Sequence, residues 1–372
     1  MNLLVVRTSA LGDIVHGLPV LGALRRHFPD ARLGWVVEAP FAPIVRHHPA
    51  IDELIPVRMR AWRKKPLDRA IRDEVALARE RLDSFDADVA IDLMGNHKSG
   101  FVARMSGAPR VVGATRPARR EPSSAMWIND PAEIHALHAV DRTLDVLRPL
   151  GIDQPEVDFA ADALLPPRLD GVDDDLPQPP YLLIQAGAGW GNKQYPMAWW
   201  GTVAEILHRR TGIDIHLPTA PGEETLAARI AAASRGTARV IEAHDFRRLA
   251  RLLRGAALVL GGDTGPIHLA HALGAPVLMV MGPTDPLRNG PWHAPERSLH
   301  HRLPCSFCYK RLSEAKACLL ALAPATVASK ACELLRIDGE IDQHGVVRQH
   351  GVTRQHGDTT MSPQPPRDED PA

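Results

Sequence analysis

A single carboxylate lies at a chemically suggestive position near the start of the sequence. Asp13 belongs to RTSALGDIVHGLP, residues 7–19, and follows a glycine where the apolar run NLLVV should give way to a helix. A carboxylate there either complements the positive end of a helix dipole or takes a proton from a bound hydroxyl group as a general base. The residues alone leave both explanations open.

A second polar cluster lies in residues 258–292, LVLGGDTGPIHLAHALGAPVLMVMGPTDPLRNGPW. Asp263 and Thr264 stand at the expected start of a helix that carries His268. Backbone N–H groups at a helix start attract anions, and small glycines let a phosphate come close. The turn GPTDP, residues 282–286, follows the next expected strand, and ligands of open α/β sheets bind at such strand ends. We expect a diphosphate-like anion here, with an ordinary capped helix as the alternative.

Two nucleotide-binding motifs are absent from the sequence. It contains no GxxxxGK[ST] loop, and its first turn, RTSALGD, lacks the GxGxxG spacing of dinucleotide-binding folds. This argues against a P-loop ATPase and a dehydrogenase. The acidic run at residues 173–175 lies among prolines, which favours a solvated hinge over a metal-binding motif.

The elements that must position these residues alternate along the chain. Residues 3–6, 32–38 and 87–93 read as buried strands with helical segments between them. A Pro- and Asp-rich stretch interrupts this pattern, which restarts at YLLIQAG and predicts a second α/β half with a parallel sheet. We place the halves at residues 1–165 and 181–340, a linker at 166–180, and a disordered low-complexity tail containing three QHG repeats at 341–372.

Composition narrows the class of protein. The chain has 372 residues, 45% of them hydrophobic, and its 44 basic and 44 acidic side chains cancel, so its overall charge does not indicate nucleic-acid binding. Arg7 and Asp13 interrupt the apolar N-terminal run, so it does not resemble an export signal. No run reaches the roughly 18 to 20 apolar residues that span a bilayer. We expect a soluble cytoplasmic protein.

Three segments together resemble a known enzyme family. Residues 5–55, the middle segment DLMGNHKSGFVARMSGAPRVVGATRPARRE at 92–121, and GGDTGPIHLAHALGAPVLMVMGPTDPLRNGPW at 261–292 are similar to the ADP-heptose:lipopolysaccharide heptosyltransferases of glycosyltransferase family 9. The SALGD form of the first motif is more similar to the heptosyltransferase I branch than to the II branch. The resemblance implies the GT-B architecture: two Rossmann-like, doubly wound parallel-sheet domains face a cleft, with the acceptor on the N-terminal one and the nucleotide sugar on the C-terminal one.

The resemblance also implies roles for individual residues. Asp13 matches the general base of an inverting, metal-independent transfer that uses no cofactor, with ADP-heptose as a substrate. One carboxylate suffices chemically, because a diphosphate leaves without the protonated acid that a glycosidase needs. The residues that match the donor site are Lys193, Glu223, His244, Asp263, Thr264, Gly265 and His268. The turn QAGAGWGN, residues 185–192, departs from the heptosyltransferase I pattern, which has Thr or Ser there.

An anionic acceptor, the Kdo region of lipid A, follows from the same resemblance. Two basic runs, RMRAWRKKPLDR at 58–69 and RPARRE at 116–121, could attract its phosphate and carboxylate groups. A solvated helix face is the alternative for such runs. The predicted acceptor-binding residues are Arg60, Arg63, Lys64, Lys98, Arg119 and Arg120. We expect peripheral association with the cytoplasmic face of the inner membrane through charge, without a transmembrane segment and without nucleic acid as a partner.

The cysteines allow two interpretations. Cys305 and Cys308 form a CxxC pair, with Cys318 and two histidines nearby, so that three or four zinc ligands are conceivable. The segment RLSEAKAC lacks a further cysteine that relatives commonly carry, which favours free thiols and no metal.

The function predicted from the sequence is heptose transfer from ADP-heptose to a Kdo residue of the lipopolysaccharide inner core. A family 9 transferase with another acceptor, such as a later core heptose or a different glycan, or with another donor, is the alternative. A non-catalytic nucleotide-sugar-binding protein is the hypothesis from a different class.

Overall fold

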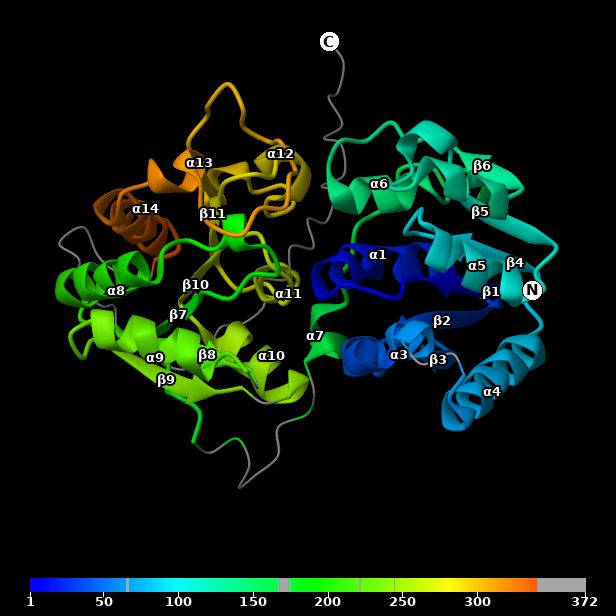
Figure 1. The fold of residues 1–372 in the computed structure, drawn as a ribbon, viewed down its shortest axis with the longest axis horizontal. Coiled ribbons are helices and arrows are strands. Elements are labelled where there is room, and N and C mark those ends of the chain that lie inside the picture. The colour runs from blue at the N-terminus through cyan, green and yellow to red at the C-terminus, as the bar shows by residue number, and fades with distance from the viewer. Residues whose placement is uncertain are drawn as a thin grey trace, which may run out of the picture.

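A computed structural model describes residues 1–339, apart from 65–66, 166, 168–172, 174, 221 and 244. The predicted tail at 341–372 and several residues of the predicted linker lie outside the described residues. Figure 1 shows two α/β halves side by side, joined through the segment that contains α7 (Ala161–Leu164). Two parallel sheets with flanking helices confirm the predicted fold class, while the domain boundaries stay a prediction.

The N-terminal half contains one six-stranded sheet in the order β3-β2-β1-β4-β5-β6, and all of its strand pairs are parallel. Its central strand, β1, is an almost continuous apolar run because helices cover both faces of the sheet. The strands are β1 (Asn2–Val6), β2 (Arg32–Glu38), β3 (Glu53–Val57), β4 (Val89–Asp92), β5 (Arg110–Ala114) and β6 (Asp130–Ala132).

The C-terminal half repeats this topology. Its sheet has the order β12-β11-β10-β7-β8-β9, so β7 and β10 are central neighbours, as β1 and β4 are in the first sheet. Each order reverses at that central pair, and open α/β sheets bind ligands at this switch point, beyond the carboxyl ends of the strands. The strands are β7 (Tyr181–Gln185), β8 (Asp214–Thr219), β9 (Ala238–Glu242), β10 (Leu258–Gly261), β11 (Val277–Met281) and β12 (Ser298–His300).

Helices connect the strands of both halves. In the N-terminal half they are α1 (Leu11–His27), α2 (Ala42–Val45), α3 (Met59–Lys64), α4 (Arg69–Phe85), α5 (His97–Met105) and α6 (Ala139–Asp145). In the C-terminal half they are α8 (Met197–Thr211), α9 (Glu224–Ala233), α10 (Phe246–Gly255), α11 (Gly265–Ala272), α12 (Pro286–Asn289), α13 (Ala317–Leu320) and α14 (Pro324–Ile337). Among the described helices, none combines the length and apolar character needed to cross a membrane.

The two halves meet through α1 and α11, which face each other at the centre of the molecule (Figure 1). Their contact requires two glycines. A Cβ atom on Gly12 would lie 2.8 Å from His268 Cδ2, and one on Gly265 would lie 2.6 Å from Leu11 Cβ. One cluster of buried apolar side chains includes members of both halves, among them Leu18 and Ile267. The two halves therefore share a packed interface.

A buried ion pair fixes the loop that follows β5. Arg119 lies 2.5 Å from Asp92, and neither side chain is exposed to solvent (0% each). The Arg119 Nε also donates to Ser124 Oγ at 2.8 Å. We predicted Arg119 as an acceptor-binding residue, and that role stays a prediction; in this structure its guanidinium is enclosed and bonded to Asp92 and Ser124.

Removing Arg119 should destabilise the protein. In Arg119→Met, the Asp92 carboxylate would stay buried without its partner, and breaking such a pair typically lowers the free energy of unfolding by about 3 kcal/mol or more. Urea unfolding followed by circular dichroism measures the change. The neighbouring Arg120 is exposed, so Arg120→Met should unfold like the wild type; equal stability of both variants would contradict the structural role of Arg119.

Candidate active site

Asp13 occupies the first turn of α1, just beyond the carboxyl end of β1. Its carboxylate accepts a hydrogen bond from the Ala10 N–H at 3.3 Å and lies 3.4 Å from the Arg7 guanidinium. Arg7 is buried and donates from Nε to the Asp13 carbonyl at 2.6 Å. The Asp13 side chain is nevertheless 47% exposed. The carboxylate is therefore held in place yet open to a ligand, and the general-base role stays a prediction alongside the capping contact.

On the C-terminal side, Lys193, Asp263 and His268 form one chain of contacts at the switch point between β7 and β10. Lys193 Nζ lies 2.5 Å from Asp263 Oδ2, and His268 Nε2 lies 2.9 Å from Asp263 Oδ1. Burial would raise the pKa of Asp263, but the hydrogen bond from His268 and the charge of Lys193 outweigh it and hold that pKa well below its usual range. Asp263 is therefore ionised and fixes both donors.

The start of α11 presents backbone donors, as the sequence predicted. The N–H groups of Ile267 and His268 donate to the Thr264 carbonyl, and Pro266 has no N–H. In the described part of the chain, the N–H groups of Thr264 and Gly265 make no hydrogen bond. These two donors lie beside Gly262 and Asp263, where they are available to an anion.

Three buried polar side-chain atoms surround the same strand ends. Gln185 Oε1 ends β7, Thr264 Oγ1 follows β10, and Thr284 Oγ1 follows β11; none has a hydrogen-bond partner among the described residues. Buried polar atoms normally have partners. A polar ligand at this edge of the sheet would supply them.

A hydrogen bond joins the two halves at this site. His16, on α1, places Nε2 3.1 Å from Nδ1 of His268 on α11. Burial, followed by the charges of His268 and Arg7, lowers the pKa of His16 well below its ordinary value, so His16 is neutral. His268 uses its other ring nitrogen, Nε2, to donate to Asp263. Hydrogen bonds therefore connect Lys193, Asp263, His268 and His16 in one chain that ends on α1.

Further contacts between the halves surround His16. His138 donates from Nε2 to the Gly290 carbonyl at 3.0 Å, and Trp292 donates from Nε1 to Asp141 at 2.9 Å. These groups line a small interdomain pocket, whose members are Val15, His16, His138, Val140, Phe159, His268, His271, Gly290 and Trp292. Burial lowers the pKa of His138 and brings that of His271 to about 4, so the pocket favours neutral histidines.

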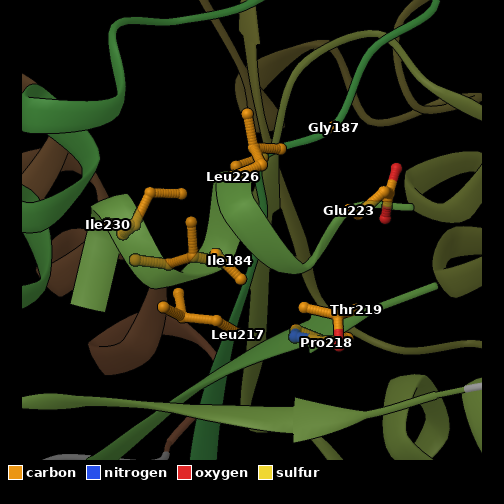
Figure 2. Close-up of a pocket in the computed structure, with 10 residues that line it drawn as sticks. Ile184, Gly187, Leu217, Pro218, Thr219, Glu223, Leu226 and Ile230 are labelled. Atoms are coloured by element: carbon orange, nitrogen blue, oxygen red, sulfur yellow. The ribbon is translucent and has the colours of Figure 1, made fainter. Parts of the chain in front are cut away.

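Glu223 lies at the rim of another, largely apolar pocket in the C-terminal half. Figure 2 shows the apolar side chains of Ile184, Leu217, Leu226 and Ile230, which come from β7, β8 and α9, with the Glu223 carboxylate set apart from them on the other side of the view. A Cβ atom on Gly187 would lie 2.4 Å from Glu223 Oε1, so the carboxylate packs directly on the turn after β7. His244, predicted as its neighbour in the donor site, lies outside the described residues.

The predicted acceptor-binding residues lie on separate elements of the N-terminal half. Arg60, Arg63 and Lys64 are exposed on α3, and Lys98 is exposed on α5. Arg60 and Lys98 both act on Glu38 at the end of β2: burial raises the pKa of Glu38, and the Arg60 backbone N–H together with these charges partly offsets the rise.

The backbone around the exposed Arg120 packs against the segment that precedes Lys98. A Cβ atom on Gly95 would lie 3.4 Å from the Arg120 nitrogen, and the His97 N–H, at the start of α5, donates to Glu121 at 2.8 Å. Acceptor binding by Arg60, Arg63, Lys64, Lys98 and Arg120 stays a prediction.

The three cysteines at residues 305–318 differ in their exposure to solvent. Cys305 and Cys308 are exposed, whereas Cys318 is buried. Within the described ranges, no group of three or more His, Cys, Asp or Glu side chains is arranged to hold a metal ion. The metal-free interpretation of these cysteines stays a prediction.

Sequence reasoning missed His16, His138 and Arg7. A usable signal existed for His16, because it lies three residues after Asp13 and so shares one face of a helix with it. No comparable signal existed for His138, whose partner is 152 residues away in the sequence.

The fold and the site together define a class. Two Rossmann-like halves meet with an exposed carboxylate on one side and backbone donors beside an ionised Asp–Lys–His set on the other, which is the architecture of a GT-B glycosyltransferase. The sequence model of glycosyltransferase family 9 (heptosyltransferase) matches residues 75–319. This chain belongs to glycosyltransferase family 9, and it is a transferase.

Individual relatives agree with this assignment. Lipopolysaccharide heptosyltransferase 1 of Pseudomonas aeruginosa is 34% identical over 312 residues, which cover 84% of this chain and 87% of that protein. The Escherichia coli K12 protein of the same name is 33% identical over 292 residues, covering 77% of this chain and 89% of that protein. Among solved structures, E. coli heptosyltransferase WaaC with ADP superposes with a TM-score of 0.74 at 30% identity, covering 90% of this chain and 100% of that chain.

Removing the imidazole of His16 should loosen the contact between the halves. In His16→Ala, His268 Nδ1 loses its buried partner, which typically costs about 1 to 3 kcal/mol. We expect faster amide hydrogen exchange in both α1 and α11, measured by mass spectrometry. His47 is exposed, so His47→Ala should change neither helix; unchanged exchange in His16→Ala would show that the hydrogen bond contributes nothing to the interface.

Acid should destabilise the protein through its buried histidines. The pKa of His271 is lowered by burial to about 4, whereas an unfolded histidine titrates near about 6.5. Between these values the unfolded chain binds a proton that the folded chain excludes, so stability falls as the pH falls, by up to about 1.4 kcal/mol per pH unit for each group.

Thermal unfolding across this pH window measures the effect. In His271→Gln the amide replaces the donor to the Trp292 carbonyl without titrating, so its melting temperature should fall less steeply with acid than that of the wild type. Parallel curves would contradict the assignment to His271.

Proposed function

We propose that this chain transfers L-glycero-D-manno-heptose from ADP-heptose to a Kdo residue of the lipopolysaccharide inner core, with inversion at the anomeric carbon. Its relatives support the reaction class: they are named lipopolysaccharide heptosyltransferase 1, and WaaC was solved with ADP and with ADP-2-deoxy-2-fluoro heptose. The observation that carries the proposal is the 3.1 Å contact between His16 and His268. It brings the helix of Asp13 against the helix start that presents Thr264 and Gly265.

Asp13 acts as the general base in this proposal. The acceptor hydroxyl oxygen forms a bond to the anomeric carbon, its proton passes to the Asp13 carboxylate, and the bond from that carbon to the diphosphate oxygen breaks. The electron pair of the broken bond leaves on ADP. The contacts of Arg7 and Ala10 orient the carboxylate, while its exposed face remains free to meet the hydroxyl group.

The departing diphosphate is stabilised by the C-terminal half. The N–H groups of Thr264 and Gly265 donate to it, and Lys193 neutralises the charge that develops. The Asp263 carboxylate accepts hydrogen bonds from Lys193 and His268 and so holds both side chains in position. We propose that the reaction is metal-independent, because these cationic and N–H donors already serve the leaving group. Glu223 is proposed to contact the donor ribose.

The acceptor meets the basic rim of the N-terminal half. We propose that Arg60, Arg63, Lys64, Lys98 and Arg120 attract the anionic Kdo and lipid A groups at the cytoplasmic face of the inner membrane. Exposure of these side chains on α3, α5 and the loop after β5 supports this assignment. The Glu38 carboxylate, which interacts with Arg60 and Lys98, would orient these two side chains.

A family 9 transferase with another acceptor or donor is the second candidate. The specific observation in its favour is the turn after β7, where Gly187, Ala188 and Gly189 carry no hydroxyl groups. Thr or Ser at this turn in heptosyltransferase I would offer side-chain donors that this chain lacks.

ADP release tests the proposal. Wild-type protein, ADP-heptose, Kdo-lipid A and EDTA should give acceptor-dependent ADP, and Asp13→Asn should lower kcat by at least about 100-fold, because general bases contribute roughly 10² to 10⁴. ADP binding, measured by calorimetry, should be unchanged in that variant. Asp30 is exposed in the turn after α1, so Asp30→Asn serves as the matched control with wild-type turnover.

Each contrary outcome has a distinct meaning. Binding of ADP-heptose without release would favour the alternative acceptor, and no binding would refute the donor. Full activity of Asp13→Asn would refute the general-base assignment, and activity that requires added metal would refute metal independence.

A further inference from the structure

One loop of the C-terminal half lies against the turns that follow β7 and β11. Residues 301–316, here called the strap, follow β12 and lead into α13, the orange loop beside that helix in Figure 1. The strap carries several basic and aromatic side chains, among them Arg302, Tyr309, Lys310 and Arg311. The strap is attached to the rest of the domain at two points, and these determine where its side chains lie.

The strap is attached to the loop after β7 by Asn192. The Asn192 side chain donates to the Lys310 carbonyl at 2.8 Å and accepts from the Leu312 N–H at 3.3 Å, and its own N–H donates to the Leu312 carbonyl at 3.1 Å. Asn192 is buried. The backbone on either side of Arg311 is therefore fixed against the turn that carries Lys193.

The strap is also attached to the loop after β11. The Tyr309 N–H donates to the Pro283 carbonyl at 3.0 Å, and the Tyr309 hydroxyl accepts from the Asp285 N–H at 3.2 Å and donates to Asn289 at 2.9 Å. Because β10 lies between β7 and β11 in the sheet, a segment held at both outer loops must cross the end of β10. Asp263 and Thr264 lie there, and the charge of Asp263 acts on Tyr309.

Arg311 meets Lys193 over one aromatic ring. Lys193 Nζ lies 4.4 Å from the centroid of the Trp190 ring, and the Arg311 guanidinium carbon lies 4.7 Å from the same centroid. In the part of the chain that the structure describes, Arg311 makes no ion pair or side-chain hydrogen bond, whereas Lys193 is paired with Asp263. Cation–π contact thus positions a second cation, one without a carboxylate partner.

We propose that Arg311 is a donor-binding residue that contacts the diphosphate of the nucleotide sugar, with Trp190 and Asn192 as its positioning residues. The inference rests on the proposed function, since it assumes a nucleoside diphosphate at the end of β10. A guanidinium offers paired donors to phosphate oxygens. Arg311 thereby supplies side-chain donors at a site where Gly187, Ala188 and Gly189 supply none.

Binding of ADP and AMP to wild type, Arg311→Gln and Arg311→Lys tests this role by calorimetry. Arg311→Gln should raise the Kd of ADP about ten-fold, typical of a lost charge-assisted contact, and that of AMP clearly less, because AMP lacks the second phosphate. Arg311→Lys should recover part of the loss. Arg302→Gln is the matched control: Arg302 lies on the same strap, with its guanidinium carbon 6.0 Å from the centroid of Phe307, and its loss should leave both affinities unchanged.

The outcomes separate the inference from the function on which it rests. Wild-type protein that binds no ADP would refute the donor assignment itself. Tight ADP binding by both the wild type and Arg311→Gln would overturn only the role of Arg311. An equal loss of ADP and AMP affinity, or an equal loss in Arg302→Gln, would show that the strap acts through its fold and not through the Arg311 charge, and would also overturn the inference.

Discussion

The close contact of α1 with α11 is the constraint on which the arrangement of the site depends. Two glycines, Gly12 and Gly265, leave the room for it, and the hydrogen bond between His16 and His268 closes it. Because the halves otherwise carry separate sheets, this contact sets the distance between the Asp13 carboxylate on one side and the start of α11 on the other. A side chain at either glycine would push the two helices apart.

The carboxylates on the two sides of this contact differ in burial and in the number of their partners. On the C-terminal side, Asp263 is buried and ionised only because Lys193 and His268 both donate to it; an unpaired carboxylate there would be strongly disfavoured. On the N-terminal side, Asp13 is half exposed and held by Arg7 at its edge. The first carboxylate thus fixes Lys193 and His268, whereas the second remains accessible to solvent.

The basic residues show the same division between structural and accessible charge. Arg119 and Arg120 are adjacent in the sequence, yet the first is enclosed with Asp92 and the second faces solvent. In the C-terminal half, Lys193 is paired with a carboxylate while Arg311, over the same Trp190 ring, has none among the described residues. Basic character in a sequence therefore does not identify which cations can meet an anion; burial and the presence of a partner decide it.

The sequence by itself determined the alternating strands and helices, the parallel sheets, and the polar turns after β1 and β10, because these depend on apolar periodicity and on local glycine and cap chemistry. The first helix, α1, begins at Leu11, and the Asp13 carboxylate accepts from the Ala10 N–H in its first turn.

Only the tertiary structure decided which distant residues meet. His16 and His268 are 252 residues apart, and the strap reaches Trp190 from the far end of the sheet. It also decided that Arg119 is buried and Arg120 is not. Such outcomes depend on how whole elements pack and on which polar groups lose their water, and neither is encoded in the spacing of a short motif.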